Sequence, residues 1–232
     1  LPMWPRPDPL GAHTGALGQV LRAAAAHPDV RRLVIALGGS ASTDGGVGAL
    51  RALGAEFALV DLVDIDPARV HGPDGLADDL VAACADYEAS IRAAGGVDVQ
   101  ILGISTDGHI AFNEPGSSLA SRTRIKTLTR QARIDNARFF DGDVEAVPVH
   151  CLTQGIGTIM AARHIVLVAS GRAKAEAVHQ LIEGPISALW PATILQMHPH
   201  VTVIIDPAAA GLLQLADYYR DTLADKPTWQ AF

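Results

Sequence analysis

Residues 97–115, VDVQILGISTDGHIAFNEP, decide the fold. The branched apolar residues of 97–104 predict a β-strand that is buried on both faces. Gly103 and Gly108 then allow the backbone to leave the strand as a loop. Open α/β sheets bind their ligands at the carboxyl ends of strands, so we expect this loop to carry the functional site.

Three groups that can move protons stand in this loop: Asp107, His109 and Glu114. A carboxylate two residues from an imidazole can fix its tautomer and raise its basicity. A second carboxylate could supply or remove a proton. The same spacing also suits an Asp-Gly turn with a surface histidine and a helix-capping glutamate. Spacing alone leaves both interpretations open.

Three further apolar segments, 33–37, 164–169 and 201–205, also have the composition of buried strands. Patterns typical of helices lie between them, and the sequence predicts helices at 77–94, 154–163, 171–183, 187–197 and 207–223. Alternating strands and helices indicate an α/β fold: one doubly wound, mostly parallel, Rossmann-like sheet with helices on both faces.

The whole chain has 232 residues, 49% of them hydrophobic, and a formal net charge of −7. That charge argues against nucleic acid or an anionic membrane as a partner. No apolar run is long enough to span a bilayer, and no signal peptide is evident. Two cysteines, Cys84 and Cys151, suggest neither a disulfide framework nor a metal site. We therefore expect a cytoplasmic protein. The first residue is not methionine, and the sequence looks as if it was cut from a longer one.

A glycine-rich loop follows the first predicted strand. Residues 38–46 read GGSASTDGG, and a helix is expected at 47–53. Strand, glycine-rich loop and helix can offer backbone N–H groups to a phosphate, which makes Gly38, Gly39 and Ser40 a candidate anion loop. Such turns also occur without any ligand.

Basic residues are concentrated at 122–138, and a further basic residue is predicted at the start of a helix. The cluster holds Arg122, Arg124, Lys126, Arg130, Arg133 and Arg138. A dense positive patch in an acidic protein suggests anion binding, although helix geometry can also turn Arg130 and Arg133 into solvent. Lys174 is predicted in the first turn of a helix, where its charge opposes the helix dipole. An anion bound between the lysine side chain and the helix N-terminus would explain why a lysine stands there.

The amino-acid sequences of several segments closely resemble those of one family. These are DGHIAFNEP (107–115), SSLASRTRIKT (117–127), CLTQG (151–155), GRAKA (171–175) and WPA (190–192). Over about residues 60–232 the chain resembles glucosamine-6-phosphate deaminases. The resemblance implies conversion of glucosamine 6-phosphate and water to fructose 6-phosphate and ammonia, without a metal or organic cofactor. It also implies a small-molecule sugar phosphate as substrate and a homo-oligomer.

The same resemblance assigns roles to individual residues. His109 would open the sugar ring by proton transfer at the ring oxygen, with Asp107 and Glu114 orienting it and tuning its basicity. Arg138 and Lys174 match ligands of the substrate phosphate. Ser118, Arg124 and Lys126 match positions at which some members bind an allosteric amino-sugar phosphate.

Residues 5–58 resemble a different family. GGSASTDGGVG (38–48) and ALGA (52–55), with DPL at 8–10 and TG at 14–15, are similar to glycerate kinases. Nothing later in the chain resembles the rest of such a kinase, which excludes a whole one. We therefore expect a kinase-like fragment at 1–59 and a deaminase-like α/β domain at 60–232, joined near 58–63, that could pack as one sheet.

This arrangement replaces the deaminase family's own first third. By resemblance, that third carries the aspartate that removes the C2 proton. Because general-base catalysis is typically worth 10² to 10⁴-fold, we expect activity to be reduced by at least that order, or absent. Asp44 is the one acid in the replacement loop and the candidate substitute. The alternative is a catalytically inactive phosphosugar-binding module or a chimeric gene product without a selected role.

Ser105 is a departure inside the matched part, because the family usually has glycine there. If the position required a positive φ, serine would cost on the order of 1 kcal/mol and could shift the loop.

Overall fold

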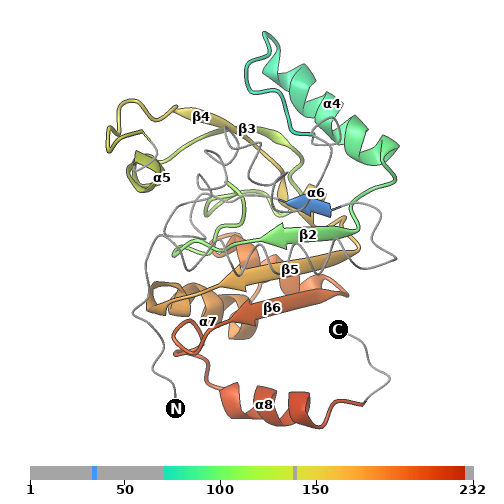
Figure 1. Ribbon diagram of the computed structural model, residues 1–232, viewed down its shortest axis with the longest axis vertical. Helices are drawn as coiled ribbons and strands as arrows, with labels where there is room; N and C mark the ends of the chain where they lie inside the picture. The colour runs from blue at the N-terminus through green and yellow to red at the C-terminus, as the bar shows by residue number, and fades with distance from the viewer. Residues whose placement is uncertain (1–32, 36–70, 138–139, 228–232) are drawn as a thin grey trace, which may run out of the picture.

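A parallel four-stranded sheet forms the centre of the computed structural model, which describes residues 33–35, 71–137 and 140–227. Its strands are β1 (Leu33–Ile35), β2 (Val99–Leu102), β5 (His164–Ala169) and β6 (Val201–Ile205), in the order β1-β2-β5-β6 (Figure 1). All of its neighbouring strands run parallel, so their carboxyl ends share one edge. All four predicted strands are confirmed.

β2 lies between β1 and β5. Its four residues are all buried, as the run of branched residues predicts. Val99 is in register with Leu33 on one side and with His164 on the other. The strand from the N-terminal segment therefore lies in the same sheet as the strands that follow residue 60.

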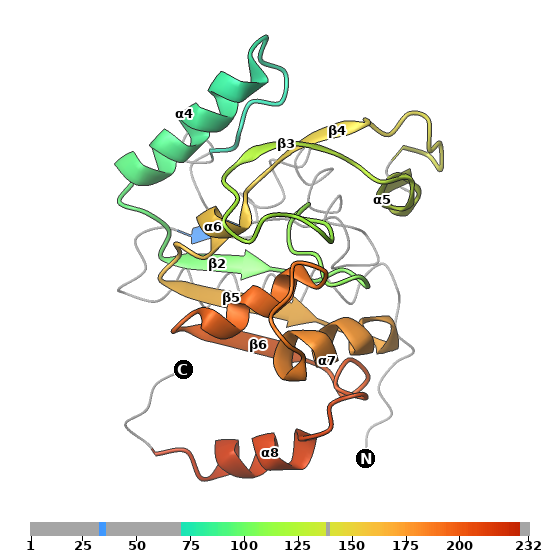
Figure 2. The ribbon, with the colours of Figure 1, turned by 180° about the vertical axis from the view of Figure 1, so that it is seen from behind.

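The helices are α4 (Leu80–Ala93), α5 (Arg130–Asn136), α6 (Ile156–Ile159), α7 (Ala175–Glu183) and α8 (Ala216–Ala224), with 3₁₀ helices η3 (Arg172–Lys174) and η4 (Pro191–Met197). Figure 2 shows α7 and η4 in front of β5 and β6, covering one face of the sheet. The core between these layers contains Leu102, Ile165, Leu167, Val178 and Leu195. Burial of these branched side chains fixes the carboxyl ends of β2 and β5 relative to each other.

A second, two-stranded sheet was not expected from the sequence. β3 (Arg124–Thr127) pairs antiparallel with β4 (His150–Thr153), with Arg124 opposite Thr153. The charges of 122–138 suggested only a cationic patch. β3 alternates between half-buried and exposed positions, and the half-buried ones are Arg124 and Lys126, so the usual apolar signal of a strand is missing.

Three predicted helices differ from the structure in extent. The helix at 207–223 begins only at Ala216, because Asp206 accepts the N–H of Ala209 and holds 207–215 in turns. Of 187–197, only Pro191–Met197 is helical, and it is a 3₁₀ helix that starts at the proline. Of 154–163, α6 covers Ile156–Ile159.

Candidate active site

A tight turn at 105–109 follows β2 and holds the first two predicted catalytic groups. The N–H of Ser105 donates to the carbonyl of His109 over 3.1 Å, and the N–H of Gly108 donates to the carbonyl of Ser105 over 3.2 Å. Gly108 has φ +78°, and a Cβ there would lie 2.6 Å from Cε3 of Trp190. Only glycine fits this turn, because both the positive φ and the indole ring exclude a side chain.

The structure brings Asp107 and His109 together. Nδ1 of His109 lies 2.8 Å from Oδ1 of Asp107, which is an ion-pair distance but lacks hydrogen-bond geometry. His109 is 7% exposed, and within the described residues its Nε2 has no hydrogen-bond partner. A buried imidazole with one nitrogen beside a carboxylate and the other unoccupied is suited to proton transfer.

Asp107 is an anion in this setting. Partial burial opposes its ionisation, but the contacts with the His109 imidazole and a hydrogen bond from Ser105 outweigh that cost. Together they hold the pKa of the Asp107 carboxyl well below its usual range. A permanent negative charge beside Nδ1 favours the tautomer with its proton on Nδ1.

Ser105 does not have the positive φ that would have strained a serine. The described non-glycine residues with positive φ are Ala111 and Asp141. Ala111, at φ +49°, lies buried in the loop between His109 and Glu114. Backbone strain in this loop therefore falls on Ala111, at a typical cost of about 1–2 kcal/mol.

Glu114 is buried at the other end of the loop and faces the start of α5. Its Oε1 accepts the hydroxyl of Thr129 over 3.0 Å and the Thr129 N–H over 3.4 Å. Thr129 is also the N-cap of α5, accepting the N–H of Ala132 over 3.1 Å. α5 is capped at Ala137, so the predicted phosphate ligand Arg138 comes directly after it. Arg138 itself lies outside the described residues.

Asn113 ties the loop to the two-stranded sheet and was not singled out from the sequence. Its Nδ2 donates to the carbonyls of Ile110, over 3.0 Å, and Gln154, over 2.8 Å. Its Oδ1 accepts from Nη1 of Arg124 over 2.8 Å. Asn113 is fully buried, so these bonds hold the backbone between His109 and Glu114 in one conformation.

Lys174 lies at the junction of η3 and α7, just beyond the carboxyl end of β5. Because β2 and β5 are parallel neighbours, this junction and the loop at 103–116 lie at the same edge of the sheet. Asp206, after β6, accepts the N–H of Gly171 over 3.0 Å and so fixes the segment that carries Lys174. The candidate anion loop, Gly38, Gly39 and Ser40, and also Asp44, lie outside the described residues.

Two of the three predicted allosteric residues share one face of a strand, and the third lies in a loop. Arg124 and Lys126 occupy the half-buried face of β3, while Ser118 is exposed in the preceding loop. Cys151 on β4 lies near this face. Burial raises the pKa of its thiol to about 12. The charge of Glu114 also raises this pKa, whereas the charges of Lys126 and Arg124 lower it. The two cations and the Glu114 carboxylate therefore all lie within electrostatic range of Cys151.

Arg133 is a correction to the sequence interpretation, which allowed it to point into solvent. Its side chain is 14% exposed and donates to the carbonyls of Val147 and Val144 and to Glu145. Backbone carbonyls attract its fork of donors inward, and the loop after α5 is thereby held against the helix. Arg130 is exposed.

Glu88 on α4 is a buried carboxylate that joins this helix to the segment before β3 and to α6. It accepts hydrogen bonds from the N–H and hydroxyl of Thr123 over 2.9 and 2.6 Å and from the hydroxyl of Thr158, and it pairs with Arg122. Burial opposes its ionisation, but the bonds from Thr123 and Thr158 and the charge of Arg122 lower the pKa of Glu88. The pattern of apolar residues along the helix could not indicate Glu88, because it places a charged side chain at a buried position.

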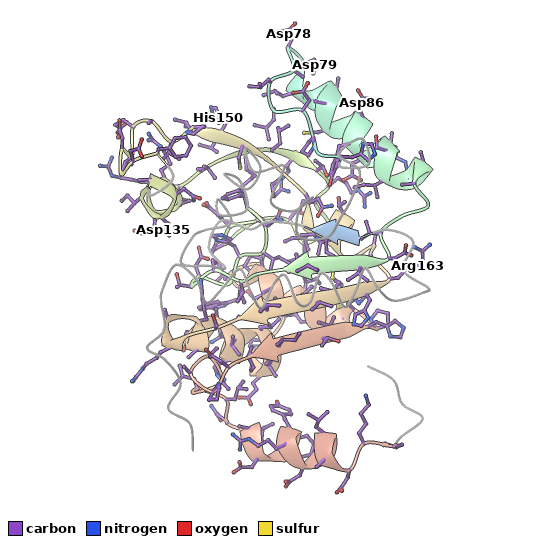
Figure 3. The ribbon with its side chains drawn as sticks, in the orientation of Figure 1. Asp78, Asp79, Asp86, Asp135, His150 and Arg163 are labelled. Carbon is purple, nitrogen blue, oxygen red and sulfur yellow. The ribbon has the colours of Figure 1, made fainter. Side chains whose placement is uncertain are left out.

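Three acidic residues of the described part of the chain lie away from the loop after β2. Asp78, Asp79 and Asp86 lie along the exposed end of α4 (Figure 3), where Asp79 caps the helix by accepting the N–H groups of Val81 and Ala82. Within the described residues, no group of three or more His, Cys, Asp or Glu side chains is placed to hold a metal ion. No helix in that same part of the chain is long and apolar enough to cross a membrane.

Residues 52–204 match the family model of glucosamine-6-phosphate isomerases and 6-phosphogluconolactonases, and residues 3–100 match that of the glycerate kinase family. The chain is similar to a glucosamine-6-phosphate deaminase of Mycolicibacterium smegmatis, with 74% identity over 175 residues, 75% of this chain and 67% of the relative. A deaminase of Beutenbergia cavernae is 74% identical over 168 residues, 72% of this chain and 64% of the relative. The chain thus spans about two thirds of the length of these relatives.

Two solved structures agree with the fold. A monomeric glucosamine-6-phosphate deaminase superposes with a TM-score of 0.71 at 36% identity, covering 84% of this chain and 95% of that one. A 6-phosphogluconolactonase from Leishmania guyanensis superposes with a TM-score of 0.55 at 20% identity, covering 85% and 92%. The second likeness shows the fold alone.

Proposed function

The chain belongs to the glucosamine-6-phosphate isomerase and 6-phosphogluconolactonase family, and from this premise we propose that it is a deaminase-isomerase acting on glucosamine 6-phosphate. Glucosamine 6-phosphate and water would give fructose 6-phosphate and ammonia. The observation that carries the proposal is His109, buried at the carboxyl end of β2 with Asp107 beside Nδ1 and no hydrogen-bond partner at Nε2 among the described residues. The proposal needs no metal or organic cofactor.

In the proposed mechanism, His109 opens the sugar ring. With its proton on Nδ1, the imidazole takes the proton of the C1 hydroxyl at Nε2 and returns one to the ring oxygen as the bond between C1 and that oxygen breaks. Asp107 stabilises the imidazolium that forms between these two transfers. Glu114, fixed by Thr129, helps to orient the imidazole from the other end of the loop.

Arg138 and Lys174 would hold the substrate phosphate. Lys174 stands beyond β5, beside the loop that follows β2, and Arg138 directly follows α5, whose first turn contacts Glu114. Two cations that approach a phosphate from separate elements would fix the sugar relative to His109.

The later step, proton transfer at C2, limits the expected activity. By the resemblance, the family's C2 base belongs to its first third, and here a segment similar to glycerate kinases would stand in that place. We therefore propose turnover at least 10² to 10⁴-fold below that of an intact deaminase, with Asp44 as the candidate substitute base. The same replacement favours the second candidate function, an inactive phosphosugar-binding module or a chimeric gene product.

Regulation, assembly and location complete the proposal. Ser118, Arg124 and Lys126 would bind an allosteric amino-sugar phosphate, which the shared face of Arg124 and Lys126 on β3 supports. We also propose a homo-oligomer in the cytoplasm.

The test is ammonia release from glucosamine 6-phosphate by the purified chain, beside His109→Ala and, as a matched control, His150→Ala on the exposed end of β4. Release that disappears only in His109→Ala supports the enzyme. No release, with thermal stabilisation by the sugar phosphate that Lys174→Ala weakens, supports the binding module. Neither release nor stabilisation overturns the enzyme and the binding module and leaves the chimeric gene product, and hydrolysis of 6-phosphogluconolactone would assign the other activity of the family.

A further inference from the structure

The hydroxyl of Ser105 contacts both ends of the turn that carries the catalytic pair. Its proton is donated to Oδ1 of Asp107, and its oxygen accepts the N–H of His109 over 2.8 Å. Ser105 is 2% exposed, so water does not compete for this hydroxyl. In the proposed mechanism it moves no proton.

Asp107 needs an anchor, because its side chain is 48% exposed. A half-exposed carboxylate can turn into solvent and lose its contact with the imidazole. The contact with Nδ1 lacks hydrogen-bond geometry, and the His109 N–H reaches the same oxygen only over 3.2 Å. Among the described groups around this carboxylate, the buried hydroxyl of Ser105 is the donor best placed to fix its rotamer.

We propose that Ser105 is the positioning residue of the Asp107–His109 pair: its hydroxyl holds the carboxylate against Nδ1 and thereby keeps Nε2 of His109 free of its proton. The consequence for ring opening rests on the proposed function, whereas the orientation of the imidazole does not. Within the described residues, the groups that perturb Asp107 are His109 and Ser105, together with partial burial.

The hydroxyl of Ser105 gives the carboxylate one charge-assisted hydrogen bond. A free imidazole prefers the proton on Nε2, so a carboxylate held at Nδ1 must reverse that preference. Without the hydroxyl, Asp107 divides its time between Nδ1 and solvent, and the ratio of Nδ1–H to Nε2–H should fall by about tenfold, the worth of one such bond.

The experiment is ¹⁵N NMR of the imidazole nitrogens at pH 8 in the full chain, which reads the tautomer without substrate. Ser105→Ala and Ser105→Gly both remove the hydroxyl, and Ser90→Ala on α4, whose exposed hydroxyl donates to the backbone carbonyl of Asp86, is the control for loss of a serine hydroxyl. We expect the Nδ1–H tautomer in the parent and in Ser90→Ala, and the same shift towards Nε2–H in both Ser105 variants. A general loss of stability would not change the tautomer of the folded molecules.

Three outcomes overturn the proposal. One is a parent chain that already carries the proton on Nε2. Another is an unchanged tautomer in the folded Ser105 variants, which would mean that Asp107 needs no anchor. The third is failure of both variants to fold, which would assign Ser105 to the fold alone. If the parent has the expected tautomer but releases no ammonia, the proposed function fails and this inference stands.

Discussion

The hydroxyl of Thr129 donates to Oε1 of Glu114 over 3.0 Å while its oxygen accepts the N–H of Ala132 over 3.1 Å. One side chain therefore joins the catalytic loop to the first turn of α5. Because Arg138 follows α5 directly in the sequence, the proposed catalytic carboxylate and the proposed phosphate ligand would depend on the same helix. A disturbance at Thr129 should reach both.

Thr129→Val removes the hydroxyl at nearly constant volume. We expect a loss of about 1 kcal/mol in the free energy of unfolding, the usual value of an N-cap, and weaker binding of glucosamine 6-phosphate by several-fold. Urea unfolding and isothermal titration calorimetry measure the two effects. Thr129→Ser keeps the hydroxyl and should retain most of both; equal losses in the two variants would contradict a role for the hydroxyl.

Gly108→Ala tests the packing of Trp190 on the turn. A new Cβ meets Cε3 of Trp190 at 2.6 Å, and φ is +78°, so we expect a cost of about 2–4 kcal/mol and no ring opening. Gly95→Ala is the matched control, because its φ is +83° but its Cβ would meet nothing within 4 Å. That variant should lose about 1 kcal/mol in thermal or urea unfolding. Similar losses in both would show that Trp190 yields to the side chain.

Asn113→Ala should destabilise the protein by about 2–4 kcal/mol, since it removes a fully buried amide that donates to the carbonyls of Ile110 and Gln154 and accepts from Arg124. A double-mutant cycle with Arg124→Ala measures the part due to the Arg124 contact. We expect a coupling energy of about 0.5–1.5 kcal/mol. Strict additivity would mean that Arg124 does not hold the loop.

The parallel strands could be predicted because their signal is local. Branched residues make up most of β2, β5 and β6, and such runs are typical of the strands of parallel sheets. β3 could not be predicted, because its inward positions are Arg124 and Lys126. Their burial depends on contacts with Asn113 and the partner strand, which are distant in sequence.

The contact between Asp107 and His109, the proposed catalytic pair, was predictable for the same reason, and the residues that support it were not. Asp107 and His109 are two residues apart, so one turn brings them together. Thr129 reaches Glu114 across 15 residues, and Asp206 reaches Gly171 across 35. A threonine or aspartate in a loop has many local uses, and only the folded topology selects the partner.

Glu88 gives a pH-dependent prediction. Its pKa in the folded protein lies below the ordinary 4.5, because Thr123, Thr158 and Arg122 favour the anion more than burial disfavours it. A group whose pKa is lowered by folding binds its proton more weakly in the native state, so protonation favours unfolding. Its contribution to stability is therefore complete above about pH 4.5 and is lost as the pH falls through the folded pKa.

Glu88→Gln removes this titration at nearly constant size. At pH 7 we expect the variant to be less stable than the parent by about 2–3 kcal/mol, because the amide offers fewer acceptor sites to Thr123, Thr158 and Arg122. Towards pH 3 the parent should lose its advantage and the two urea curves should converge. Glu145→Gln is the control: that carboxylate is exposed and pairs with Arg133, so its variant should differ by less than about 1 kcal/mol throughout. A constant difference between Glu88→Gln and the parent from pH 7 to 3 would mean that folding does not shift the pKa of Glu88.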